Sequence, residues 1–296
     1  MTWAIGTTHS WMMTVSQRHA LWIGDSEDDE LRLARSWMRP SLEARQTPLL
    51  EFSRPADAAT LAAAEPATPR LAILATDRPA RWTLDDAIVL ARAWPLMPIV
   101  SVATSLVDGR RRSGPPLPGV EEVAWHEFPG RMEAWLADWD AGRPGTLAAP
   151  ATARRDERLL GITMAEPAAE PLAVSVVAGT PMDAEGISLV VPPAGGHVVA
   201  SRCGRPALDE SANVLVWDVG RLSPDTIGWL GILAANRPSL AIVIVDSFPR
   251  GDTAQAALDA GATAVLGKPI SIEALAGTFR RLKAGTDGLG GPSAGR

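Results

Sequence analysis

Short apolar runs alternate with segments of helical periodicity through the second half of the chain. Ala173–Val177, Val214–Trp217 and Ala241–Val245 are continuous runs, as in strands that are buried on both faces of a sheet. His197–Cys203 is a weaker predicted strand, and Ala264–Leu266 is a short last one. Apolar residues at helical spacing occupy Thr226–Ala235, Thr253–Ala260 and Ile272–Leu282. The alternation predicts a parallel sheet with helices on both faces.

Local signals add detail to this half. Gly261 is expected to close the helix before it, and Asp252 could cap the start of the same helix. The segment AEGISLVVPPAGG (184–196) contains two prolines and three glycines. We therefore expect the first helix of this half to be damaged.

The first half repeats the plan less regularly. Its predicted strands are Ala20–Ile23, Leu49–Phe52, Leu71–Ala75, Ile99–Ala103 and Val123–Trp125. Its predicted helices are Glu27–Trp37, with Ser26 as a candidate cap, Ala56–Ala64, Leu84–Ala93 and Arg131–Trp139. DGRRRSGPPLPG (108–119) stands where a further helix is expected, but its three prolines and three glycines argue against a full helix.

Two α/β domains in tandem follow from this pattern. The predicted domains cover residues 19–141 and 171–283, after an N-terminal extension over 1–18. Pro, Ala and Gly dominate residues 142–170, which are expected to form a linker. The Gly-rich tail 284–296 is expected to be disordered.

Composition and charge narrow the class of protein. The chain has 296 residues, 46% of them hydrophobic, and a net charge of −6. These values suit packed cores and make nucleic acid or an anionic membrane a poor partner. The longest dense apolar run, Leu240–Val245, is far shorter than the ~20 residues that span a bilayer. The lone Cys203 permits no intrachain disulfide. We expect a cytoplasmic protein.

Polar residues follow several of the predicted buried strands in the second half. In open parallel sheets, sites form beyond the carboxyl ends of the strands. Asp218 follows the third strand, Asp246 and Ser247 follow the fourth, and Lys268 follows the fifth. Asp218 and Lys268 are therefore expected to meet across a crevice, either as a functional pair or as a structural ion pair.

The second half resembles a response-regulator receiver domain, the flavodoxin-like module of two-component signalling. The resemblance rests on NVLVWD, AIVIV and AGATAVLGKPI between Asn213 and Leu282. It implies a doubly wound, parallel five-stranded sheet in each half. It also implies that Asp218 is the phosphoacceptor and a weak Mg²⁺ ligand, and that Lys268 binds phosphoryl oxygens.

The second half also departs from the family pattern. Ala178 and Gly179 stand where the family has an acidic pair that holds Mg²⁺, a cation that prefers oxygen ligands. Asp183 could substitute if its loop folds back. The position of the family's fourth-strand hydroxyl falls on Asp246 or, with a shift of one residue, on Ser247. Asp246 could then act as a fixed negative charge near Lys268.

The first half resembles the same fold more faintly. LWIGDSEDD (21–29) fits the acidic loop, but the phosphoacceptor position in LAILATDRP (71–79) falls on Ala75. The lysine position falls on the histidine of AWHEFP, and the hydroxyl position on Ala103 or Thr104. The candidate residues of this degenerate pocket are Asp25, Glu27, Asp77, Thr104 and His126.

We weigh three functions on this basis and favour the first, with the second as the alternative. The first is a non-enzymatic bacterial tandem pseudo-receiver that binds a histidine kinase, a regulator or an output protein without a phosphorylation cycle, with a homodimer also conceivable. The family's usual contact face is made by the fourth helix, fifth strand and fifth helix, and the first half could present residues 108–119 there. No cofactor is expected.

The second function is a working response regulator phosphorylated on Asp218, which would require Mg²⁺. The third is a small-molecule-binding α/β protein, against which the chain has no GxGxxG after a strand, no GxxxxGK[ST] and no GxSxG.

Overall fold

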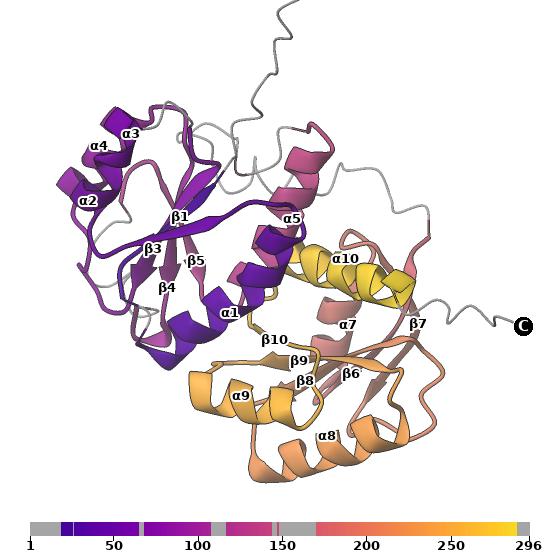
Figure 1. Ribbon diagram of the computed structural model, residues 1–296. Helices are drawn as coiled ribbons and strands as arrows, with labels where there is room; N and C mark the ends of the chain where they lie inside the picture. Colours follow the sequence, from indigo (N-terminus) through magenta and orange to yellow (C-terminus); the bar gives the residue numbers. More distant parts are fainter. Residues whose placement is uncertain are drawn as a thin grey trace, which may run out of the picture.

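The structure is a computed structural model that describes residues 19–25, 27–64, 68–107, 117–143, 147 and 170–288. It contains two five-stranded sheets, and every strand pair in both is parallel. Figure 1 shows the two sheets as separate layers, with helices from both units between them. The predicted α/β class with two parallel sheets is confirmed.

The first unit is built on the order β2-β1-β3-β4-β5. Its strands are β1 (Ala20–Ile23), β2 (Leu49–Phe52), β3 (Leu71–Thr76), β4 (Ile99–Ala103) and β5 (Val120–Ala124). Its helices are α1 (Asp29–Glu43), α2 (Pro55–Ala59), α3 (Leu61–Ala64), α4 (Leu84–Ala93) and α5 (Phe128–Asp140). All six residues of β3 are buried, as expected for a central strand covered on both faces.

The second unit has the order β7-β6-β8-β9-β10. Its strands are β6 (Leu172–Ala178), β7 (Gly196–Cys203), β8 (Val214–Gly220), β9 (Ala241–Asp246) and β10 (Ala264–Gly267). Its helices are α7 (Pro181–Val190), α8 (Pro224–Asn236), α9 (Gly251–Asp259) and α10 (Ile272–Gly288). Numbered within each unit, both orders are 2-1-3-4-5, which is the flavodoxin-like arrangement.

Helix α7 corrects the expectation of a damaged first helix. Pro181 occupies the first turn, where a missing N–H costs nothing, and the Thr180 hydroxyl accepts from the Asp183 N–H. Pro192 and Pro193 lie beyond the last helical residue, so they bound the helix and do not break it. Gly186 in the interior is tolerated.

The predicted helix ends need further corrections. Asp28 caps α1, whereas Ser26 lies outside the described residues. Arg250, not Asp252, is the N-cap residue of α9. Helix α10 runs to Gly288, past the expected start of a disordered tail at Ala284, and most of 108–119 and of the linker 142–170 lies outside the described residues.

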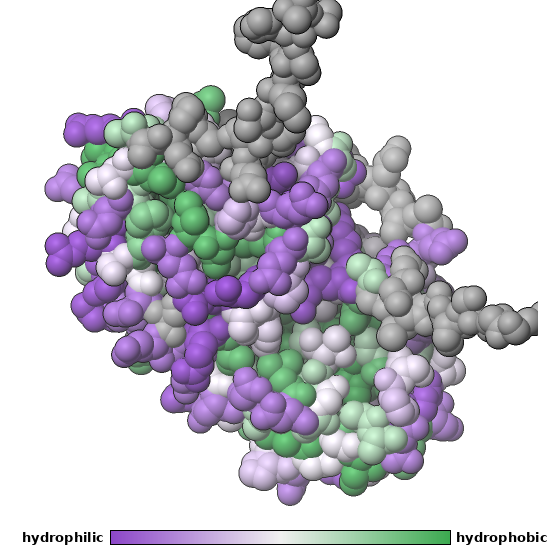
Figure 2. Space-filling model, viewed as in Figure 1, coloured by the Kyte–Doolittle hydropathy of each residue, from purple (hydrophilic) through white to green (hydrophobic). Residues whose placement is uncertain are grey.

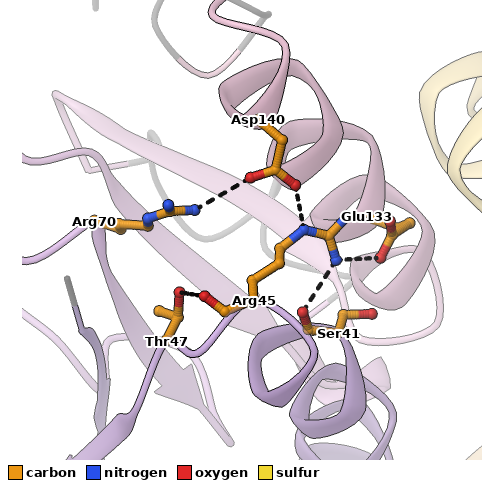
Figure 3. Close-up of polar contacts among 6 residues, drawn as sticks. All are labelled: Ser41, Arg45, Thr47, Arg70, Glu133 and Asp140. Atoms are coloured by element: carbon orange, nitrogen blue, oxygen red, sulfur yellow. Dashed lines mark hydrogen bonds and ion pairs between the residues drawn. The ribbon is translucent and has the colours of Figure 1, made fainter. Parts of the chain in front are cut away.

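Arg45, which lies just after α1, makes ion pairs with two residues of α5, Glu133 and Asp140 (Figure 3). Its guanidinium is 2.6 Å from the Glu133 carboxylate and 2.5 Å from that of Asp140. Arg70, just before β3, lies 3.7 Å from the other oxygen of Asp140. These carboxylates raise the pKa of Arg45 against the opposing effect of burial. The ion pairs hold α5 in place, and α5 carries the contact with the second unit.

The two units pack against each other through α5 and α10, and α1 also contacts α9. Figure 1 shows α5 and α10 side by side between the sheets. One hydrophobic cluster runs through both units, from Leu31 and Trp135 to Leu233 and Val265. The two units therefore share a hydrophobic core.

Candidate functional site

A pocket of about 470 Å³ opens at the carboxyl ends of β6, β8 and β10. This is the edge at which sites form in parallel sheets. Asp218 lies near the end of β8, Lys268 directly follows β10, and Asp183 lies in the first turn of α7. All three side chains line the pocket.

Lys268 is held by two carboxylates. Its Nζ lies 2.5 Å from Asp218 Oδ2 and 3.2 Å from Asp183 Oδ1. Burial acts to lower the pKa of Lys268, but the hydrogen bonds and negative charges of Asp218 and Asp183 outweigh it and raise this pKa. The predicted meeting of Asp218 and Lys268 is confirmed, and Asp183 joins them because α7 brings it over the strand ends.

Each carboxylate has a second donor that fixes it. The N–H of Gly220 donates to Asp218 Oδ1 at 2.9 Å, and the Thr180 hydroxyl donates to Asp183 Oδ2 at 2.6 Å. The bond from Thr180, followed by that from Lys268, lowers the pKa of Asp183. The Asp218 side chain is only 1% exposed and that of Asp183 39% exposed, so Asp218 is the stronger partner of the lysine.

Asp246 and Ser247 are not among the residues that line the pocket. The buried Asp246 carboxylate accepts from the backbone N–H groups of Leu222 and Phe248. Its link to Lys268 runs through the backbone, where the Lys268 N–H donates to the Asp246 carbonyl at 3.1 Å. The Asp246 carboxylate therefore holds the backbone of the neighbouring loops, and its expected role in a phosphate pocket stays a prediction.

Thr226 and Arg205 line the pocket instead. Thr226 comes from the first turn of α8. Arg205 comes from the loop after β7, where its guanidinium lies over the Trp229 ring, 4.9 Å from the ring centroid. Sequence reasoning missed both, because neither follows a predicted strand directly. The only local signal for Thr226 was its place three residues after Ser223, the cap of α8.

The pocket does not fit the Mg²⁺ site of receiver domains. Ala178 and Gly179 occupy the acidic positions, and the two pocket carboxylates are both bound to Lys268. In the part of the chain that the structure describes, no three His, Cys, Asp or Glu side chains gather in a way that could hold a metal ion.

The first unit brings two of its candidate residues into contact. Asp25 and Glu27 are exposed after β1. Asp77 pairs with Arg78 at 3.1 Å and Arg81 at 3.7 Å, and only its backbone carbonyl accepts from the Thr104 hydroxyl. Thr104 and Asp77 are thus in contact, and a degenerate pocket in this unit stays a prediction.

His126 points to the second unit and not to a pocket of its own. Its Nδ1 accepts from the Gly267 N–H at 3.1 Å, directly before Lys268. Burial lowers the pKa of His126 to about 4. The ring lies so close to Gly267 that any side chain there would collide with it.

Glu30 of the first unit also contacts the second unit, and sequence reasoning missed this residue. Its carboxylate accepts from the Ser105 N–H at 2.6 Å, the Ser105 hydroxyl at 2.8 Å and the Gly251 N–H at 3.1 Å. Gly251 begins α9. Glu30 and His126 thus hold the two loops that follow β9 and β10, the second of which carries Lys268.

Three solved structures are among those to which the chain is similar. The chain is similar to a pilus assembly protein, cpaE, from Burkholderia thailandensis (20% identity, 38% of this chain and 98% of that chain, TM-score 0.35). It is similar to the chemotaxis response regulator CheY4 of Vibrio cholerae (21% identity, 38% of this chain and 98% of that chain, TM-score 0.33). It is also similar to the receiver domain of a Francisella response regulator (23% identity, 39% of this chain and 98% of that chain, TM-score 0.34).

No protein-family model and no curated protein matches the chain. The resemblance to receiver domains is confirmed at the level of the fold, because both sheets have the 2-1-3-4-5 order of flavodoxin and receiver domains. Among the described helices, none is long and apolar enough to cross a membrane.

Proposed function

We propose that this chain is a cytoplasmic tandem pseudo-receiver that acts by binding other proteins of a two-component-type phosphorelay. The observation that carries the proposal is the occupied lysine. Lys268 is bound by Asp218 and Asp183, and Ala178 and Gly179 supply no ligand for a cation. An incoming phosphoryl group would have to displace Asp183 and bring its negative charge beside Asp218 without a metal to offset it.

The surface left for such partners is not the usual one. In the second unit, α9, β10 and α10 contact α1, His126 and α5 of the first unit. We propose that a partner instead meets the outer face of α8, which covers the side of the sheet opposite to α7 and α10. Ile232 on α8 is 47% exposed. Figure 2 shows apolar surface in the region of α8 and α9.

The alternative is a working receiver, which the retention of both an aspartate and a lysine at the family's phosphoacceptor and lysine positions, Asp218 and Lys268, favours. Intact mass after incubation with acetyl phosphate and Mg²⁺ separates the two, with Asp218→Asn as the control. The pseudo-receiver gains no phosphoryl group while it stays folded by circular dichroism. A gain of one phosphoryl group that Asp218→Asn abolishes would establish the alternative.

A gain-of-function variant sharpens this test. The Cβ of a residue at position 179 would meet no atom within 4 Å, so an aspartate fits there. If the lost acidic pair is what prevents phosphorylation, Gly179→Asp restores one carboxylate and should raise metal-dependent uptake above that of the parent chain. Gly179→Asn has the same shape without the charge and serves as its matched control.

A further inference from the structure

Two side chains of the first unit reach backbone groups of the second unit at glycines. His126 Nδ1 accepts from the Gly267 N–H, and the Glu30 carboxylate accepts from the Gly251 N–H, both at 3.1 Å. A Cβ at Gly267 would collide with the His126 ring, and a Cβ at Gly251 would lie 2.9 Å from Glu30 Cγ. Neither glycine has a positive φ. The two glycines are therefore needed for the close approach of these side chains and not for the course of the backbone.

The His126 contact lies one residue from the pocket lysine. β10 is an edge strand, and its last residue, Gly267, donates its N–H to His126 where a further strand would otherwise pair. The next N–H, that of Lys268, donates to the Asp246 carbonyl at 3.1 Å, and Lys268 Nζ lies 2.5 Å from Asp218 Oδ2. These three contacts on two successive residues hold one conformation of the segment, and each favours the conformation in which the others form.

Burial and charge suit both ends of this segment to a fixed state. Burial lowers the pKa of His126 to about 4, so the ring is neutral at physiological pH and its Nδ1 is free to accept a hydrogen bond. At the other end, the hydrogen bonds and charges of Asp218 and Asp183 raise the pKa of Lys268 against the opposing effect of burial. The bound lysine therefore keeps its proton and reacts slowly with acylating reagents, whereas a released lysine loses its proton more readily.

We propose that the first unit fixes the position of Lys268 through His126, a positioning residue of the pocket, and that loss of this contact frees the lysine from Asp218. Glu30 has the same role at the loop after β9, farther along the chain from the lysine. Coupling of this kind is reciprocal, so a ligand that draws Lys268 away from Asp218 also loosens the contact between the units. The proposal goes beyond the proposed function and does not rest on it, because the release of Lys268 is measured without a phosphoryl donor.

Acetylation of Lys268 in the full chain measures its release. The reagent is N-hydroxysuccinimidyl acetate at about pH 8, and the only other lysine of the chain, Lys283, is the internal standard. His126→Leu removes the acceptor and should raise the rate at Lys268 by about 3–10-fold, the ratio that corresponds to one net hydrogen bond. His126→Asn keeps an acceptor oxygen at the place of Nδ1 and should react like the parent chain. Peptide mass spectrometry reads both lysines in one sample.

Two further variants separate positioning from a general loss of stability. Leu90 in α4 is fully buried in a hydrophobic cluster that belongs to the first unit alone. Leu90→Ala weakens the first unit without touching the pocket loops, so it should leave the rate at Lys268 unchanged. Glu30→Ala should raise this rate, but by less than His126→Leu, since its loop reaches Lys268 only through the Asp246 carbonyl.

Hydrogen exchange tests the coupling from the side of the pocket. Asp218→Asn removes the main negative charge that holds Lys268, so the peptide that contains Gly267 should exchange faster than in the parent chain. The peptide that covers α4 should exchange as before. This measurement leaves His126 in place, and it therefore decides the matter if His126→Leu does not fold.

Three results would overturn the proposal. One is a folded His126→Leu chain in which Lys268 is acetylated at the parent rate. The second is an equal rise in Leu90→Ala, which would assign the release to a general loosening of the first unit. The third is unchanged exchange around Gly267 in Asp218→Asn. Phosphoryl uptake by Asp218 would refute the proposed function and leave all three measurements as they are.

Discussion

The two sheets carry the same strand order but use the ends of their strands differently. In the second unit, Asp218 and Lys268 meet in an open pocket at 2.5 Å. In the first unit, Ala75 takes the position of Asp218, and the strand registers put Trp125, directly before His126, at that of Lys268. His126 turns away from its own sheet and binds the Gly267 N–H of the other unit.

This difference separates the scaffold from the site. The flavodoxin-like order brings the same strand ends together in both units, whatever side chains they carry. The second unit retains a charged pair there, whereas the first unit has an apolar strand end and uses its remaining polar groups on the interface. The first unit therefore contacts, through Glu30 and His126, the loops that follow β9 and β10 of the second unit.

The largest loss of stability is expected when the first unit is given an aspartate at Ala75, the position that Asp218 holds in the second unit. Ala75 is 2% exposed, and no lysine follows β5 to pair with an acid there. Ala75→Asp should lower the free energy of unfolding by about 3–5 kcal/mol, because it buries a carboxylate without a cation. Urea denaturation measures this. Asp218→Ala, which removes the acid from the second unit and leaves Lys268 with Asp183, should cost clearly less. Equal costs would mean that the two strand ends are alike.

The pH dependence of stability should report His126. Its pKa is about 4 in the folded protein, below the ordinary value of 6.5, so the unfolded chain binds more protons between these values. Stability is complete above pH 6.5 and falls as the pH drops toward 4, by up to about 3 kcal/mol. Denaturation at several pH values checks this.

His126→Gln should flatten that part of the profile, because the glutamine does not gain a proton in this range. His197→Gln, at an exposed position of β7, is the matched control and should leave the slope as it is. A profile that keeps its slope in His126→Gln would assign the pH dependence to other groups.

A smaller loss is expected when Gly267 gains a methyl group. Its Cβ would lie within 3.0 Å of the buried His126 ring. Gly267→Ala should cost about 1–3 kcal/mol through overpacking. Gly186→Ala in α7 meets no atom within 4 Å and should be neutral or slightly stabilising. Thermal unfolding of the two variants side by side distinguishes a contact across the interface from a general intolerance of alanine.

The smallest effect concerns the pocket lysine itself. Asp218 and Asp183 raise the pKa of Lys268 against the opposing effect of burial, so removing either negative charge should lower this pKa. Asp218→Asn should lower it more than Asp183→Asn, since Asp183 is the more exposed partner. The rate of acylation of Lys268 as a function of pH, followed by peptide mass spectrometry, measures the shift. A larger change in Asp183→Asn would reverse the assignment of the main partner.

Much of the fold was determined by the sequence alone. Continuous apolar runs placed most of the strands to within two residues, and the order of residues after them predicted that Asp218 and Lys268 would meet. Both inferences need only local periodicity and the rule that parallel strands end at one edge. Two strands differ more from the prediction. β8 continues past its apolar run to Gly220. β5 begins at Val120, and the sequence did not predict this start because Glu121 and Glu122 interrupt the apolar pattern.

The tertiary structure decided which way the remaining polar groups face. Glu30 and His126 bind groups of the second unit, 221 and 141 positions away along the chain. Thr226 and Arg205 reach the pocket from a helix and a loop whose direction no local pattern sets. The approach of Gly130 to Gly277 allows α5 and α10 to pack closely, and this packing covers the face that a partner would otherwise meet. Such contacts depend on the shapes of two folded surfaces, and periodicity along one chain does not encode them locally.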